Sequence, residues 1–191
     1  MSEFKNYQTY RWFYTSSGNL VLGGKSAEQN EKLLQTILQK KEVFLICHTT
    51  SPGSPFSIAI SQPEKLTKKE LYEIAVFTAS FSRAWREAKK EAQVDFFLST
   101  SLYKNKKMPV GTWGVKEVLA RITVPLLLTI KKQKNVLRAI PPEKDSSLII
   151  TPGNIPKEEF VKKLEQYFPN SQQALISALP SGKFKILKSK K

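Results

Sequence analysis

The segment RWFYTSSGNLVLGGKSAEQNEKLL, residues 11–34, contains two strand patterns and a helix start in one short stretch. The runs 11–14 and 19–22 are apolar, and the SSG between them is typical of a hairpin turn. Ser26 then precedes a leucine pattern of helical spacing, with Gln29 placed to complete a capping box. The segment predicts a β-hairpin, a tight turn at the two glycines and a helix of about four turns.

The same alternation of paired strands and helices continues along the chain. Residues 42–50 and 56–60 are apolar runs that flank the turn SPGSP, which predicts a second strand pair. Thr67 and Glu70 form a second capping box and open a pattern that predicts one long helix to Ala92. Further strands are expected at residues 94–103, 118–130 and 136–140. This order predicts an α+β fold, with a mostly antiparallel or mixed sheet packed against two main helices.

The last part of the chain has the pattern of a smaller unit. The stretch PPEKDSS, residues 141–147, is typical of a linker. We therefore predict a main domain over residues 1–140 and a small C-terminal αβ extension over residues 141–191. The extension ends in a basic tail, KFKILKSKK.

Composition excludes several classes of protein. A chain of 191 residues, 40% of them apolar, has enough material for one sizeable buried core. Its single cysteine, Cys47, excludes an internal disulfide and any zinc site built from several cysteines. No apolar run approaches the roughly 20 residues that span a bilayer, and the polar N-terminus lacks the core of a signal peptide. We expect a soluble, cytoplasmic protein that does not enter a membrane.

Positive charge is concentrated in two stretches of the chain. The net charge is +15, and residues 96–141 carry nine basic residues against the single acid Glu117. Residues 180–191 carry five basic residues and no acid. Such clustering is what a polyanion-binding surface requires. General solubility is the alternative explanation.

The sequence does not contain the pattern of a known catalytic site. GGK lacks the glycine and hydroxyl pattern of a phosphate loop, and Ser54 lacks the flanking glycines of a nucleophile elbow. His48 has no second histidine with which to form a dyad or a metal pair, and a free cysteine such as Cys47 is usually a buried apolar residue. We therefore predict a non-catalytic protein with no cofactor and no metal.

The opening segment resembles the start of the RNA-binding domain of the NFACT family, the ribosome quality-control factors. The family pattern G-[RK]-x-x-x-Q-N-[DE]-x-L falls on Gly24, Lys25, Gln29, Asn30, Glu31 and Leu33. Further along, AVFTASFSRAW, VDFF and GTWGV resemble later elements of the same domain. The C-terminal segment resembles the small unit that follows this domain in longer members, so the resemblance covers most of the chain.

A second family block departs from the pattern at its polar positions. The block D-[LI]-W-[LF]-H-x-x-x-x-P-G-S-H aligns without a gap to VFLICHTTSPGSP. Residues 52–54 keep the turn, whereas Val43, Leu45, Cys47 and Pro55 stand at the family's Asp, Trp and two His positions. These departures leave the fold implied by the resemblance unchanged.

The resemblance implies a stand-alone RNA-binding domain, because the family's N-terminal domain, helix-hairpin module and coiled coil have no counterpart here. It implies binding to transfer RNA or ribosomal RNA in connection with translation or ribosome quality control. The ribosome and other quality-control factors are the implied wider partners. The alternative is a diverged protein-interaction or adaptor domain, or a DNA-binding domain, that uses the same basic surface.

The corner GGKSAEQN is the first candidate contact with RNA. A helix start offers free N–H groups and the positive end of the helix dipole, which suit a phosphate. Lys25 adds a charge there, and the amides of Gln29 and Asn30 can bond a sugar or a base edge. The two amides can equally tie the helix to a neighbouring strand. Arg11, in the opening aromatic run, completes this first set of RNA-binding candidates.

The basic loop KNKKMPVGTWG is the second candidate. Amines neutralise phosphates while aromatic rings stack on unpaired bases, and the loop region offers both. The residues concerned are Tyr103, Lys104, Lys106 and Lys107, and the next hairpin extends the set through Lys131, Lys132, Lys134 and Arg138. The alternatives are a solvated loop for the lysines and a buried core position for Trp113.

Overall fold

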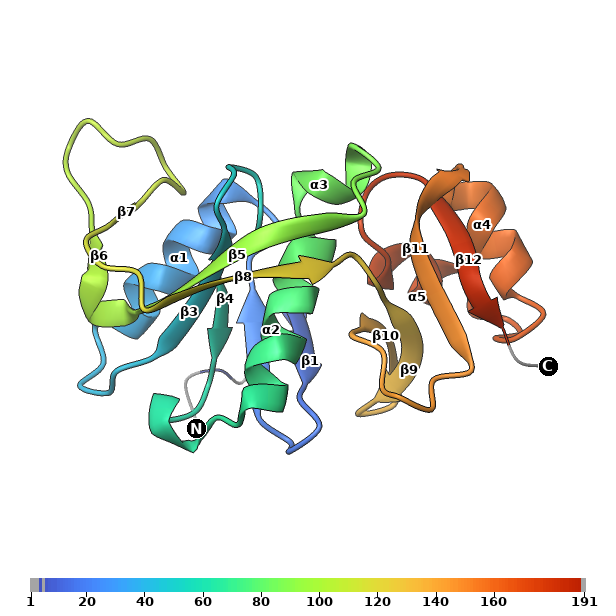
Figure 1. Ribbon diagram of the computed structural model, residues 1–191, viewed down its shortest axis with the longest axis horizontal. Coiled ribbons are helices and arrows are strands. Elements are labelled where there is room, and N and C mark those ends of the chain that lie inside the picture. The colour runs from blue at the N-terminus through green and yellow to red at the C-terminus, as the bar shows by residue number, and fades with distance from the viewer. Residues whose placement is uncertain (1–3, 5, 190–191) are drawn as a thin grey trace.

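The computed structural model describes residue 4 and residues 6–189, which form a larger and a smaller lobe side by side (Figure 1). The larger lobe contains a six-stranded sheet in the order β1-β2-β4-β3-β5-β8, and every neighbouring pair is antiparallel. Its strands are, in chain order, β1 (Arg11–Tyr14), β2 (Leu20–Gly23), β3 (Leu45–Thr49), β4 (Ser57–Ala59), β5 (Glu91–Leu98) and β8 (Ala120–Pro125). The predicted α+β fold is confirmed.

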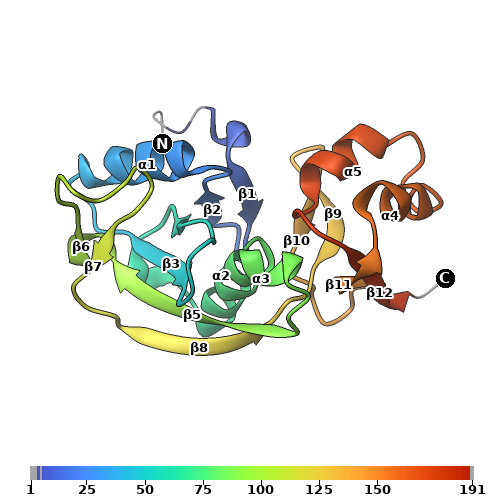
Figure 2. The same cartoon turned by 90° about the horizontal axis from the view of Figure 1, so that it is seen from above.

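Two helices cover opposite faces of this sheet (Figure 2). They are α1 (Ala27–Leu38) and α2 (Lys68–Ser80). Successive side chains of a strand point to opposite faces of the sheet, and in this sheet the side chains on both faces are apolar. Trp12 belongs to the same buried cluster as Leu33 of α1. Its neighbour Phe13 faces the other way and packs on Phe77 of α2, with 4.6 Å between the ring centroids.

The prediction of a single long helix that begins after Thr67 is wrong. α2 ends at Ser80, and the short helix α3 (Arg83–Arg86) and then strand β5 follow it. The Ser82 Oγ accepts a hydrogen bond from the Ala84 N–H at 3.1 Å and so starts a separate helix. β5 pairs with both β3 and β8, and this long-range pairing outweighs the helical pattern of AKKEA.

The smaller lobe contains the predicted C-terminal segment, residues 141–191, together with the β9–β10 hairpin that precedes it. Its elements are β9 (Thr129–Gln133), β10 (Val136–Ile140), β11 (Leu148–Ile155), α4 (Lys157–Leu164), α5 (Gln172–Ala178) and β12 (Phe184–Ser189). A backbone bridge joins Leu128 to Ile150, and Phe184 lies in the same apolar cluster as Phe77 of the larger lobe. The domain boundary at residue 141 stays a prediction, because the β9–β10 hairpin before it contacts both β1 and β11.

The basic loop runs between two short strands that pair with each other, β6 (Leu102–Tyr103) and β7 (Gly114–Val115). The described residues also include the 3₁₀ turns η2 (Tyr7–Thr9), η3 (Pro63–Lys65) and η4 (Ser99–Ser101). The last two lysines of the predicted basic tail, Lys190 and Lys191, lie outside the described residues. Within the described part of the chain, no helix has the length and apolar character that crossing a bilayer requires.

β1 is an edge strand of the sheet, and the β9–β10 hairpin covers its free edge. The Gln133 Oε1 accepts a hydrogen bond from the Tyr14 N–H, and its Nε2 donates to the Tyr14 carbonyl, both at 2.8 Å. The Arg138 Nε donates to the Trp12 carbonyl at 3.0 Å. Side chains of the hairpin therefore satisfy main-chain groups that would otherwise be open to pairing with another strand.

Glu70 is a fully buried carboxylate that ties the β1–β2 turn to the start of α2. Its Oε1 accepts from the Thr15 hydroxyl at 2.6 Å and from the Asn19 amide at 2.8 Å, and its Oε2 accepts from the Thr67 N–H and hydroxyl at 3.0 Å. Burial by itself raises the pKa of a carboxyl, but these bonds outweigh it and lower the pKa of Glu70 to about 2. The capping box predicted from Thr67 and Glu70 is confirmed.

We expect Glu70→Gln to lower the free energy of unfolding by about 2–4 kcal/mol, because buried donors then lose a charged acceptor. Urea denaturation at pH 7 measures this loss, with the exposed Glu64→Gln as the control. Because the pKa of Glu70 is depressed, its contribution is complete above the ordinary value of 4.5 and disappears as the pH falls toward about 2. Equal unfolding midpoints for the two variants at pH 7 would contradict the assigned role.

Candidate functional site

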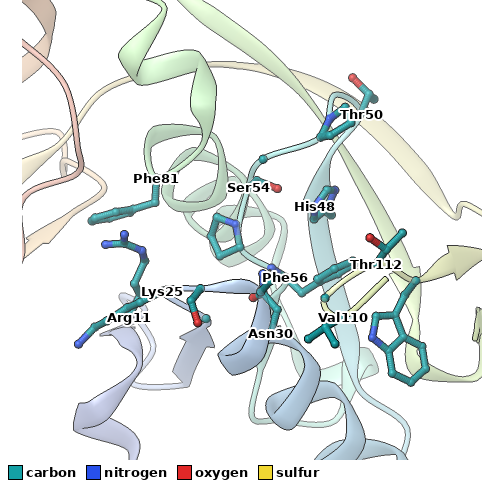
Figure 3. A pocket seen from close by; sticks show the side chains of 18 residues that line it. Arg11, Lys25, Asn30, His48, Thr50, Ser54, Phe56, Phe81, Val110 and Thr112 are labelled. Carbon is teal, nitrogen blue, oxygen red and sulfur yellow. Dashed lines mark hydrogen bonds between the residues drawn. The ribbon is translucent and has the colours of Figure 1, made fainter. Parts of the chain in front are cut away.

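Figure 3 shows a cleft with a volume of about 460 Å³ at the corner where β2 leads into α1. The start of α1, the turn PGSP after β3 and the end of the basic loop form most of its walls, and side chains from β1, from β3 and from the end of α2 complete them. The lining includes Arg11, Lys25, Asn30, His48, residues 52–56, Phe81 and residues 110–113. Segments that lie far apart in the sequence therefore meet at one concave site.

Asn30 builds the α1 wall of the cleft by packing against Gly24. A Cβ on Gly24 would lie 2.3 Å from the Asn30 Oδ1 and 2.6 Å from its backbone nitrogen, so this approach requires glycine. The same Oδ1 accepts a hydrogen bond from the Phe56 N–H at 3.3 Å, which joins α1 to the segment that enters β4. Neither Gly23 nor Gly24 has a positive φ. Close packing, rather than a special turn conformation, accounts for Gly24.

Gln29 stabilises the start of α1. The Ser26 Oγ accepts a hydrogen bond from the Gln29 N–H at 3.3 Å, as the predicted capping box requires. The Gln29 Oε1, however, accepts from the Lys25 N–H at 2.9 Å, one residue before the position that a capping box uses. The Gln29 amide also donates to the Thr9 carbonyl at 3.5 Å. The structure thus places this amide in contacts within the fold.

Arg11, Lys25 and Arg138 form a group of positive charges beside the cleft, which we call the cation cluster. The Arg11 guanidinium lies 4.7 Å from the centroid of the Phe81 ring, and that of Arg138 lies 4.7 Å from the Trp12 ring. Burial lowers the pKa of Arg11 to about 10, and burial together with the charge of Arg11 lowers the pKa of Arg138 to about 10. Burial and the charges of Arg138 and Arg11 also lower the pKa of Lys25.

No carboxylate of the described residues forms an ion pair with the cation cluster. The ion pairs that the structure does contain join other side chains. Arg138 is only 6% exposed, so solvent cannot fully screen its charge. Like charges held together without a counterion raise the local potential and favour the binding of an anion. The cleft therefore has the electrostatics of an anion site at one end.

Aromatic side chains line the rest of the cleft. The His48 ring packs on the Phe56 ring, with 4.3 Å between their centroids and 31° between their planes. Trp113, from the basic loop, also lines the cleft. Burial lowers the pKa of His48 below its ordinary value of 6.5 despite the nearby carbonyl of Thr49, so the imidazole is neutral at pH 7.

Glu31 holds the basic loop against α1. Its Oε2 accepts hydrogen bonds from the Lys104 amine, from the Gly111 N–H at 2.8 Å and from the Trp113 Nε1 at 3.1 Å. A Cβ on Gly111 would lie 2.7 Å from the Ala27 Cα, so the loop touches the first residue of the helix. Burial by itself raises the pKa of a carboxyl, but the bonds from the loop lower the pKa of Glu31. The charge of Lys104 is therefore already paired within the protein.

The remaining predicted residues of the loop lie outside the cleft. Lys106 and Lys107 are exposed, and Tyr103 is 41% exposed. Within the described part of the chain, neither lysine forms an ion pair through its side chain. Both amines are available to a polyanion that approaches the loop.

The remaining predicted residues come from the β9–β10 hairpin, which lies between β1 and β11 and away from the basic loop (Figures 1 and 2). Lys131 is paired with Glu143 at 2.9 Å, and Lys134 lies 5.4 Å from the centroid of the Tyr14 ring. Lys132 is exposed. The structure thus brings Arg138 to Arg11 and Lys25, whereas the charge of Lys131, its cross-strand neighbour, is paired with Glu143.

His48 and Phe81 are site residues that the sequence does not reveal. The gapless family alignment puts Cys47 at the first family histidine, but Cys47 is fully buried on the α2 face of the sheet, where burial raises the pKa of its thiol. The next residue, His48, lines the cleft instead. A shift of one residue along a strand reverses the face that a side chain occupies. Every residue of β3 except His48 is buried, so no alternation in the sequence of this strand marks the face that His48 occupies.

Residues 9–117 match the NFACT protein RNA binding domain, which is more than half of the chain. The chain belongs to the NFACT RNA-binding domain family. The domain is 24% identical to the archaeal Rqc2 homolog of Methanocaldococcus jannaschii, over 97% of this chain and 30% of that relative. It is 29% identical to the ribosome quality control complex subunit NEMF homolog of Drosophila melanogaster, over 56% of this chain and 10% of that relative. The chain spans less than a third of the length of these curated relatives.

A solved structure shares the fold of this NFACT domain. It is the C-terminal part of the fibronectin/fibrinogen-binding protein from Streptococcus suis, with a TM-score of 0.53 and 22% identity. The similarity covers 61% of this chain and 45% of that one. At this level of identity the comparison establishes the fold alone.

The NFACT motif around α1 divides its residues between two tasks. Gly24, Asn30 and Glu31 build the corner, because they pack together, join α1 to β4 and hold the basic loop. Lys25 is exposed at the rim of the cleft and belongs to the cation cluster. Most of the motif therefore shapes the cleft, and Lys25 supplies charge to it.

We expect Glu31→Ala to release the basic loop. Charged hydrogen bonds are worth about 1.5–3 kcal/mol each, so trypsin should cleave after Lys106 or Lys107 about 10- to 100-fold faster. Limited proteolysis followed by mass spectrometry measures the rate. Glu28→Ala, an exposed residue one turn earlier, is the control with the same change in charge. Cleavage of both variants at the wild-type rate would refute the role of Glu31.

Proposed function

We propose that this chain is a non-catalytic RNA-binding module that acts in ribosome quality control, with its RNA contacts centred on the cleft. Membership of the NFACT RNA-binding domain family supports RNA as the partner, and relatives that are ribosome quality control proteins support the setting. One observation carries the proposal to particular residues. The cation cluster lies beside a cleft lined by the family motifs and has no carboxylate partner among the described residues.

Transfer RNA and ribosomal RNA are the proposed ligands, and the ribosome or other quality-control factors are the proposed wider partners. A net charge of +15 attracts any nucleic acid over a distance, and exposed Lys106 and Lys107 add to this attraction near the cleft. Arg11, the half-buried arginine of the cation cluster, offers a planar set of N–H donors that matches the oxygens of a phosphate group. Binding should weaken steeply with salt, because each neutralised phosphate contributes about −0.7 to −0.9 to the log–log slope.

The candidate nucleophiles of the cleft region have contacts that support binding rather than reaction. The Ser54 Oγ accepts a hydrogen bond from the Thr49 N–H at 3.0 Å, which shapes the turn after β3. Cys47 is fully buried, and its raised pKa keeps the thiol protonated. Among the described residues, no three side chains of the His, Cys, Asp or Glu type gather as a metal site.

We expect the wild-type chain to bind total transfer RNA or ribosomal RNA fragments with submicromolar affinity at low salt. The double variant Arg11→Gln/Lys25→Gln should bind about tenfold more weakly, with a log–log salt slope shallower by about 1–2, because two phosphate contacts are lost. Fluorescence anisotropy across a salt series measures both quantities. Lys25→Gln alone, at an exposed position, gives half of the effect without disturbing a half-buried residue.

The control is Lys65→Gln/Lys68→Gln, which also removes two positive charges. These lysines lie at or just before the start of α2, whereas Phe81 follows the end of that helix. This control should retain wild-type affinity within a factor of about two. Equal losses in the cluster and control variants would refute the placement of the RNA contacts. Failure of the wild-type chain to bind RNA would overturn the proposed function, and equal affinity for duplex DNA would favour a DNA-binding role.

A further inference from the structure

Attraction of RNA by positive charge alone requires neither a cleft of this volume nor a lining of aromatic side chains. Its volume of about 460 Å³ falls in the range of about 300–1,000 Å³ that is typical of pockets for small molecules and cofactors. An RNA duplex keeps its bases inside the stack, so it can touch the rim of such a cleft but cannot place a base within it. A single unpaired nucleotide can enter.

The labelled side chains in Figure 3 divide the cleft into two ends. At one end the Arg11 guanidinium lies against the Phe81 ring, and Lys25 stands nearby. At the other end lie His48 and Phe56, next to Val110 and Thr112 at the end of the basic loop. This separation of charge from aromatic surface matches the separation of phosphate from base within one nucleotide.

The charged end is suited to a single phosphate group. The packing of Arg11 on Phe81 fixes the plane of the guanidinium, which favours two parallel bonds to phosphate oxygens. Ser26 and Ala27 also line the cleft, so the positive end of the α1 dipole faces the same space. These features add to the charge of the cation cluster, which no carboxylate in the described part of the chain pairs.

The aromatic end is arranged before any ligand binds. His48 packs on Phe56, and its imidazole is neutral, so the ring offers an uncharged face. Glu31 accepts the indole N–H of Trp113 at 3.1 Å and thereby fixes the orientation of that ring. Rings that are already held in place lose little conformational freedom when a base stacks on them.

We propose that the cleft binds one unpaired nucleotide of an RNA chain, with its phosphate at the cation cluster and its base against His48 and Trp113. This inference rests on the proposed function and narrows its ligand to single-stranded RNA. The nucleotide comes either from a chain terminus or from a base turned out of a loop, since both present the same chemistry.

The test compares three probes of equal phosphate number: a short oligouridylate, an abasic oligomer and an RNA duplex. The oligouridylate should bind about five- to 150-fold more tightly than the abasic oligomer, the factor expected of one stacked base. The duplex should bind no more tightly than the abasic oligomer. Quenching of intrinsic fluorescence should accompany oligouridylate binding and report on Trp113, because Trp12 and Trp85 are each only 1% exposed.

Matched variants assign the preference to the cleft. Trp113→Leu should abolish the preference for bases, whereas Tyr103→Leu, an aromatic residue of the same loop region outside the cleft, should keep it. The fluorescence measurement on the wild-type chain tests the proposal even if Trp113→Leu disturbs the loop. Binding to both linear and circular oligouridylate assigns the site to an internal nucleotide, and binding to the linear form alone assigns it to a terminus.

The outcomes separate this inference from the proposed function. Equal affinity for all three probes, together with weaker binding by the cluster variant, would overturn the nucleotide site and leave RNA binding intact. Loss of the base preference in Tyr103→Leu but not in Trp113→Leu would also overturn it. Absence of RNA binding by the wild-type chain would overturn both proposals.

Discussion

Trp12 and Phe13 are neighbours in the chain, and each is only 1% exposed because they lie on opposite faces of a sheet that is covered on both sides. A sheet with two apolar faces is stable only when each face has a cover, and here each cover follows directly in the chain. α1 comes after β2, and α2 comes after β4. The buried carboxylate of Glu70 then joins α2 to the hairpin that it packs on. The smaller lobe completes the arrangement, because Gln133 satisfies the free edge of β1.

The cleft is a consequence of how α1 leaves the sheet. The helix must rise from the end of β2 to cover one face, and the contact of Asn30 with Gly24 sets the angle at which it does so. Glu31, one residue later, brings the basic loop to the same corner. The groups that fold the corner therefore also shape the walls of the site. The positive charges of Arg11 and Lys25 have no carboxylate partner among the described residues, so they are available to a ligand.

Local features of this chain could be predicted because they depend on near neighbours. The capping box of Thr67 and Glu70 needs only a hydroxyl and a carboxylate three residues apart, and it forms as expected. The long helix predicted through AKKEA does not form, because β5 pairs with β3 and β8, two strands that are distant from it in the sequence. A local sequence pattern contains no information about such pairing. The same limit applies to the site. Lys104 lies in a basic loop by sequence, and only the fold reveals that Glu31 has paired its charge.

By itself the sequence determined the class of fold, the family motif around α1 and the excess of positive charge. Each of these depends on residue type and short spacing, such as short continuous apolar runs or a hydroxyl that caps a helix. The tertiary structure alone decided which charges and rings share one cleft. Arg11 and Arg138 stand far apart in the chain, and they meet because the β9–β10 hairpin covers the edge of β1. His48 faces the cleft and Cys47 the core because a strand turns successive side chains to opposite faces, and only strand pairing establishes which face is which.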